Sequence, residues 1–179
     1  NRIFIDRTAN VGILPVDTAI NYGVSGPNLR GSGIKWDVRK EDPYSVYHKF
    51  DYDIPVGEGK YGTVGDSWDR YYVRVLEMEE SCKIIEQALD QLPEGDVQSA
   101  IPKRIKPPVG HVYARVENPR GDLGYFIISD GSTSPYRVKV RAPSFVSMQV
   151  LNELCKGYMV ADVVTILGSI DIVLGEIDR

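Results

Sequence analysis

Hydrophobic side chains recur at spacings of three and four along one segment of the chain. They are Trp68, Tyr72, Val75, Met78, Cys82, Ile85, Leu89 and Leu92. This spacing places them on one face of a helix. Asp66 or Ser67 can cap its start, and Pro93 with Gly95 can end it. We predict a long helix whose apolar face packs, while the charged face is solvated or turned toward another protein of an assembly.

A second pattern, strict alternation of apolar and polar residues, follows after a basic, proline-rich stretch. Val112, Ala114 and Val116 alternate with polar residues, which is the period of a half-buried strand. Segments 125–129 and 136–141 resemble it, and Asn, Pro, Gly and Asp between the three segments supply turn chemistry. We therefore predict a three-stranded antiparallel meander.

The remaining segments predict helices at 15–22 and 143–156, and a last apolar helix or strand from Val160, with a glycine-rich loop at 26–33. The fold class is α+β, with the meander packed with long helices. We expect a single domain over 1–179, an exposed connector at 93–109 and an insertion loop at 57–65.

Composition and charge limit the classes of partner that the chain is suited to bind. A chain of 179 residues that is 42% hydrophobic can bury about two-thirds of its unfolded surface. Its net charge of −4 argues against nucleic acid or an anionic membrane surface as partners, because both select basic patches. No apolar run reaches the ~18 residues of a membrane span.

Metal and nucleotide motifs are also missing from the sequence. Cys82 and Cys155 stand alone rather than in a C-x-x-C pair, so this chain cannot build a zinc ribbon or an iron–sulfur cluster by itself. No G-x-G-x-x-G follows a predicted strand, and the glycines at 57–62 are only a superficial likeness, so a dinucleotide site is not expected.

Four blocks, in order along the whole chain, carry a family resemblance. They are 26–39 (GPNLRGSGIKWDVR), 65–71 (GDSWDRY), 117–124 (ENPRGDLG) and 161–179 with its ending GEIDR. The chain resembles the 49 kDa (D) component of proton-pumping NADH:quinone oxidoreductase, respiratory complex I. That family is itself similar to the large subunit of nickel–iron hydrogenases.

The resemblance implies the C-terminal part of a hydrogenase-large-subunit-like fold. The chain begins at Asn1 without a Met, and the family's N-terminal region, which carries its quinone-contacting His and Tyr, has no counterpart here. We therefore expect a C-terminal portion of the 49 kDa component, with no catalytic residue of its own and no activity in isolation.

The tail looks like a nickel-binding segment without its ligands. Hydrogenases end in D-P-C-x-x-C, whose two thiolates ligate the metal. Asp171 matches the Asp, whereas Ile172, Val173 and Glu176 stand where Pro and the two Cys would be. No metal site is therefore expected, which argues against the alternative of a large subunit from a membrane-bound hydrogenase. The other alternative is a non-catalytic scaffold derived from such a protein.

The resemblance implies that this emptied cavity holds the headgroup of ubiquinone or menaquinone. We expect Asp171, Val173, Glu176 and Arg179 to form its wall or to support it. Glu176 and Arg179 could instead form only an i,i+3 ion pair. Arg120 matches an arginine that lies beside the hydrogenase metal, so it could place a positive charge near the quinone or a cluster, or be a solvated turn residue.

Two further charged residues stand in the first block. Arg30 and Asp37 could form a buried ion pair or bind a neighbouring protein.

The resemblance also implies that this chain binds no cofactor itself, and that FMN and the iron–sulfur clusters belong to neighbouring proteins. The expected partners are the iron–sulfur (B) component, the C component and the membrane arm of complex I. The resemblance implies that the electron donor of the complex is NADH, a reduced deazaflavin or a reduced ferredoxin. It also implies that this chain is a peripheral protein on the cytoplasmic side of a bacterial or archaeal membrane, or on the equivalent side of an organellar membrane.

Overall fold

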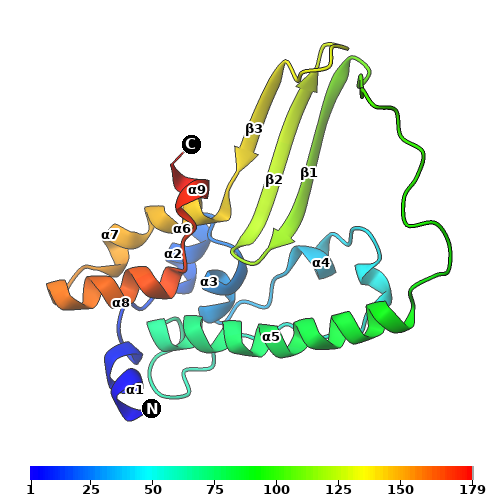
Figure 1. Ribbon diagram of the computed structural model, residues 1–179. Helices are drawn as coiled ribbons and strands as arrows, with labels where there is room; N and C mark the ends of the chain where they lie inside the picture. Colours follow the sequence, from blue (N-terminus) through cyan, green and yellow to red (C-terminus); the bar gives the residue numbers. More distant parts are fainter. Residues whose placement is uncertain (179) are drawn as a thin grey trace.

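A computed structural model describes residues 1–178 of the chain (Figure 1). Its elements in chain order are α1 (Arg2–Thr8), α2 (Val16–Asn21), α3 (Gly26–Gly31), α4 (Val38–Glu41), the 3-10 helix η1 (Tyr47–Lys49), α5 (Ser67–Asp90), β1 (Gly110–Asn118), β2 (Gly121–Ser129), β3 (Arg137–Arg141), α6 (Pro143–Gln149), α7 (Leu151–Leu154), α8 (Val160–Ile170) and α9 (Leu174–Ile177). The predicted α+β class is confirmed.

The long helix α5 begins where its capping residue predicts. The Asp66 carboxylate accepts a hydrogen bond from the Asp69 backbone N–H at 2.9 Å, which satisfies one of the donors that a helix start leaves without a partner. Trp68, in the first turn, is buried, but Ile85 is 57% and Leu89 68% exposed. The expectation that the whole apolar face packs is therefore wrong for the residues described.

In the second half of α5 the polar face makes the contacts instead. Glu80 accepts a hydrogen bond from the Asp53 N–H at 2.9 Å, and the Gln87 side chain both accepts from and donates to the Asp51 backbone. These bonds tie the extended segment before α5 to the helix, because that segment has backbone groups to satisfy and α5 offers matching polar side chains.

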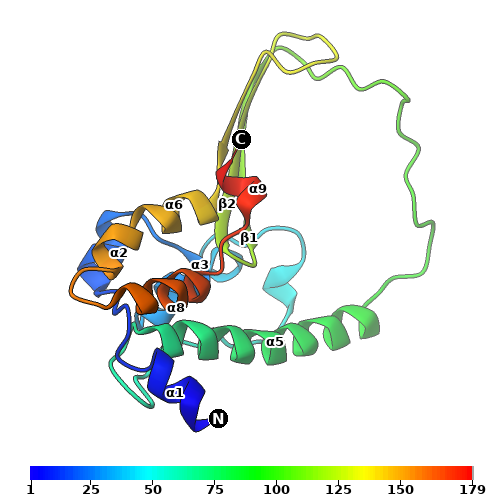
Figure 2. The ribbon, with the colours of Figure 1, turned by 60° about the vertical axis from the view of Figure 1, so that its left-hand side comes forward.

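The meander is confirmed, with strand order β1-β2-β3 and antiparallel pairing throughout. The sheet extends away from the helices, which meet only the end near the β1–β2 turn (Figures 1 and 2). Val112 is 56% and Val138 43% exposed, so the half-buried strand expected from the alternation is wrong. Alternation reports which side chains share a face, but not whether another element covers that face.

The glycine-rich segment is a buried helix rather than the loop that we predicted. Every residue of α3 is buried. A Cβ added to Gly31 would lie 3.2 Å from the Arg70 Cα, and one added to Gly26, at φ +66°, would overlap the Gly121 Cα. The glycines here permit close backbone packing onto α5 and onto the β1–β2 turn.

The apolar core lies among α2, α3, α7 and α8. Its buried members are Leu14, Ala19, Val24, Leu29, Val150, Leu154, Ile166 and Ile170. Segment 57–65 packs beside it, since the Gly57 N–H donates to the Arg30 carbonyl at 2.8 Å and the Gly59 N–H to the Asp69 carboxylate at 2.9 Å. Residues 93–109 form an exposed connection, without helix or strand, that arches away from the body (Figure 2). The single domain and the insertion remain predictions.

Candidate functional site

The tail that follows α8 is held at its first residue by two arginines. Asp171 adopts a left-handed conformation with φ 56° and ψ 59°. Its carboxylate lies 3.1 Å from Arg120 Nη2 and 3.5 Å from Arg74 Nε. Arg120 Nε also donates to the Asp171 carbonyl at 3.3 Å. Arg120 is therefore not a free turn arginine, and two residues that the sequence suggested separately lie together.

Arg74 links the tail to the centre of the fold. Its Nη1 donates to the Ser169 carbonyl at 2.9 Å, and its Nη2 donates to the Ile170 carbonyl at 3.0 Å. The last carbonyls of a helix lack partners within it and carry partial negative charge, so this half-buried cation stabilises the end of α8. Burial lowers the pKa of Arg74 to about 10, which leaves it charged at neutral pH. Its Nε is buried and has no hydrogen-bond partner among the residues described.

A fully buried arginine, Arg70, lies one turn earlier on α5. The Arg70 guanidinium donates to the carbonyls of Gly65 at 2.6 Å and Gly12 at 2.8 Å, and to the Ser169 hydroxyl at 2.8 Å. Burial, followed by the approach of Arg74, lowers its pKa to about 9. Both arginines remain positive at neutral pH, and the buried carboxylates of Asp66 and Asp69 lie at the same end of α5 and act on Arg70.

The rest of the tail rests on α6. The Val173 N–H donates to the Ser144 hydroxyl at 3.3 Å, and the Ser144 N–H donates to the Glu176 carboxylate at 3.1 Å. Arg179 lies outside the residues that the structure describes, so the predicted Glu176 ion pair remains a prediction. Ser144 thus connects Val173 and Glu176, two of the residues that the sequence suggested for the site.

Arg30 is the centre of another charged cluster. Its Nε lies 2.5 Å from Glu77, and its Nη1 lies 2.9 Å from Glu117 and 3.5 Å from Asp37. Asp37 also binds Arg39 at 2.6 Å. Arg30 and Asp37 are 2% and 1% exposed, so they form a buried ion pair within this chain.

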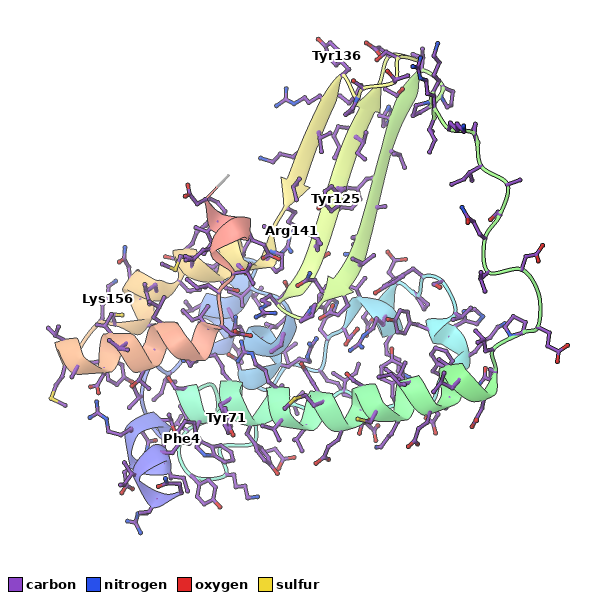
Figure 3. The ribbon with its side chains drawn as sticks, in the orientation of Figure 1. Phe4, Tyr71, Tyr125, Tyr136, Arg141 and Lys156 are labelled. Carbon is purple, nitrogen blue, oxygen red and sulfur yellow. The ribbon has the colours of Figure 1, made fainter. Side chains whose placement is uncertain are left out.

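Both clusters face one cleft of about 950 Å³. Its wall includes Asp171 and Arg74 from the first cluster and Arg30, Glu77 and Glu117 from the second. Apolar atoms predominate elsewhere in the wall, which is formed by α1, α5, α8 and the β1–β2 turn. At one end Phe4 of α1 and Tyr71 of α5 meet edge to face, with ring centroids 4.7 Å apart (Figure 3). A concave, mainly apolar site with a few converging charges is typical of a small-molecule pocket.

Comparison with known proteins identifies the family. A family model described as the respiratory-chain NADH dehydrogenase 49 kDa subunit matches residues 1–107 and 100–179. The chain belongs to this family.

The relatives agree with this assignment, and each is named as the D component of an NADH-quinone oxidoreductase. The chain is 58% identical over its whole length to the protein of Chlorobaculum tepidum, of which it covers 46%. It is 57% identical to the first D component of Cytophaga hutchinsonii, covering 48%, and 53% identical to the second D component of Anaeromyxobacter dehalogenans, covering 47%. The chain therefore spans about half the length of the curated relatives that it matches. In residues 1–178, no helix combines the length and the apolar character that crossing a bilayer requires.

Within this member of the 49 kDa family, sequence reasoning found only part of the site. It named Asp171 and Arg120 through the hydrogenase resemblance, but it missed Arg74, Glu77 and Glu117. Arg74 follows Arg70 of the GDSWDRY block by four residues, one helical turn, which places both on one side of α5. This four-residue spacing is the sequence signal by which Arg74 could have been identified. Glu117 stands at the start of its own block, but its partners are distant in the sequence and no local pattern marks them.

Proposed function

We propose that this chain contributes to the quinone-reduction chamber of a proton-pumping NADH:quinone oxidoreductase, beside the terminal iron–sulfur cluster. The observation that carries the proposal is the position of Asp171. It occupies the place of the hydrogenase Asp in the tail comparison, is held between Arg74 and Arg120, and lines a cleft of about 950 Å³. The names of the relatives support the same enzyme class.

The proposed chemistry suits this wall. Reduction of a quinone by two electrons and two protons develops negative charge on its two oxygens, and positive groups in a cleft of low polarity stabilise that charge. Arg74 Nε is a buried donor without a hydrogen-bond partner in residues 1–178. The Asp171 carboxylate lies 3.5 Å from it, an ion-pair contact longer than a usual hydrogen bond, so in this proposal the donor is available to a quinone oxygen.

The electron carriers belong to other proteins of the complex in this proposal. FMN and the iron–sulfur clusters would be held by neighbours, with the iron–sulfur (B) component next to the chamber and the C component and the membrane arm as further contacts. NADH is the proposed electron donor. We place the assembly on the cytoplasmic side of the membrane, with this chain as a peripheral component.

A substitution at Asp171 tests the chamber in the assembled complex. Asp171→Asn keeps the shape of the side chain but removes the charge that faces two arginines, so we expect quinone reduction with NADH to fall at least about tenfold. Electron transfer from NADH to ferricyanide should be spared, because that acceptor takes electrons before the quinone. Asp178→Asn, at an exposed tail position, is the matched control. Unchanged quinone kinetics and inhibitor response in a fully assembled Asp171→Asn complex would contradict the proposal.

A further inference from the structure

The Arg30 cluster contains more buried acid than base. Three carboxylates, those of Asp37, Glu77 and Glu117, surround two guanidinium groups, those of Arg30 and Arg39. Glu117 is 3% and Glu77 19% exposed. With all five groups ionised their charges sum to −1, and the nearest further cation, Arg74, acts on Glu77 rather than on Glu117. An uncompensated charge away from water is costly, and binding one proton removes it.

The geometry shows which carboxylate is best suited to hold that proton. Asp37 is bound by Arg39 through two side-chain contacts, at 2.6 and 2.9 Å, and through the Arg39 N–H at 2.9 Å. All three bonds favour its charged form, and the pKa of Asp37 is lowered. Glu77 reaches Arg30 at 2.5 Å from a position that remains in contact with solvent.

Glu117 is buried, at 3% exposure, and has no arginine of its own. It shares Arg30 with the other two acids, at 2.9 Å, and accepts one backbone bond from the Val38 N–H at 3.2 Å. Burial raises its pKa, and the nearby Asp37 carboxylate raises it further, against the opposing effect of Arg30. Tyr44, from the segment after α4, faces its backbone, where the hydroxyl accepts the Glu117 N–H at 3.1 Å.

Glu117 lies where a proton on its carboxyl group could reach the cleft. Glu117 lines the cleft that Asp171 also lines. It stands three residues before Arg120, the arginine that holds Asp171, at the end of β1 that leads into the turn to β2. Glu77 lines the same cleft and is the more exposed acid of the cluster, which makes it a suitable point of contact with solvent protons.

We propose that Glu117 is a proton-holding residue that supplies one of the two protons consumed when a quinone is reduced in this cleft. The inference rests on the proposed function. The quinone receives two electrons from the NADH-linked carriers of the complex. As the O–H bond of the Glu117 carboxyl group breaks, its proton passes to a reduced quinone oxygen and the carboxylate is left charged. A solvent proton that enters past Glu77 restores the neutral acid, and the second quinone proton comes from another source.

The pH profile of the assembled complex tests this role. The rate of quinone reduction by the wild-type complex should fall as the pH rises through the raised pKa of Glu117. Glu117→Gln should lower the rate at least about tenfold at neutral pH and abolish this alkaline decline, since an amide holds no transferable proton. Glu86→Gln, at an exposed position of α5 that does not line the cleft, is the matched control and should retain both the rate and the decline. Ferricyanide reduction should be unaffected in every variant.

A second variant moves the proton affinity without changing Glu117. Asp37→Asn removes the neighbouring charge that raises the pKa of Glu117 and frees Arg39, so the decline should shift to lower pH. Asn still caps the start of α4, which favours normal assembly. An unchanged decline in Asp37→Asn, or a decline that persists in Glu117→Gln, would overturn the inference. A wild-type complex that reduces no quinone would instead refute the proposed function.

Discussion

The close approach of two glycines decides where Arg120 lies, so we predict a large effect of Gly121→Ala. Gly121 has φ +126°, a conformation that costs a residue with a Cβ about 1–2 kcal/mol. The new Cβ would also lie 2.8 Å from the Ser25 carbonyl carbon and 2.9 Å from the Gly26 nitrogen. These are backbone atoms that cannot rotate away, and such overpacking typically costs a further 1–3 kcal/mol, so roughly 2–5 kcal/mol in all.

Thermal unfolding of the purified chain measures this loss. For a chain of this size each 1 kcal/mol shifts the melting temperature by about 2–4 °C, which predicts a drop of about 4–20 °C. Gly131→Ala is the control, because Gly131 also has a positive φ of +87° but its added Cβ would meet only a side-chain atom of Val109, at 3.4 Å. It should lose only about 1–2 kcal/mol.

The difference between the melting temperatures of the two alanine variants tests the prediction. If Gly121→Ala melts at the same temperature as Gly131→Ala, the contact between α3 and the β1–β2 turn does not hold the sheet in place. In the assembled complex, Gly121→Ala should also impair quinone reduction more than Gly131→Ala, because a displaced turn moves Arg120 away from Asp171.

Three further predictions follow from the buried charges and the tail. Arg30→Met should destabilise the chain by about 3–5 kcal/mol in urea unfolding, because it leaves buried carboxylates uncompensated, whereas Arg2→Met, in an exposed pair, should change little. Because the folded-state pKa of Glu117 is raised above 4.5, the free energy of unfolding should decrease as the pH rises from 4.5 through that pKa, and Glu117→Gln should remove this decrease in a pH series of unfolding curves. Val173→Met in the assembled complex should impair quinone turnover or change inhibitor sensitivity, because added volume where the tail packs on α6 typically costs about 1–3 kcal/mol or moves its neighbours, Asp171 among them; unchanged values would make the tail purely structural.

The sequence alone determined the features that depend on neighbouring residues. The Asp66 cap and the spacing of apolar side chains predicted α5, and Asn118 and Gly121 with the alternating segments predicted the meander, because caps and turns are satisfied within a few residues. The four family blocks, which occur in order along the chain, were likewise identified from the sequence alone. Asp171 and Arg120 could be named as candidates only through those blocks.

The tertiary structure decided what lies across from each element. Periodicity identifies the apolar stripe of α5, but only the folded chain shows that the polar face makes the contacts in the second half of the helix. Composition suggested a loop at the glycines of α3, and only the neighbouring backbone of α5 and of the β1–β2 turn shows that a helix needs them there. Arg74 meets Asp171, and Arg30 meets Glu117, across 97 and 87 residues of chain, through contacts that no local pattern records. The Arg30 and Glu117 charges affect each other strongly because the fold buries both, at 2% and 3% exposure, and burial is a property of the folded chain.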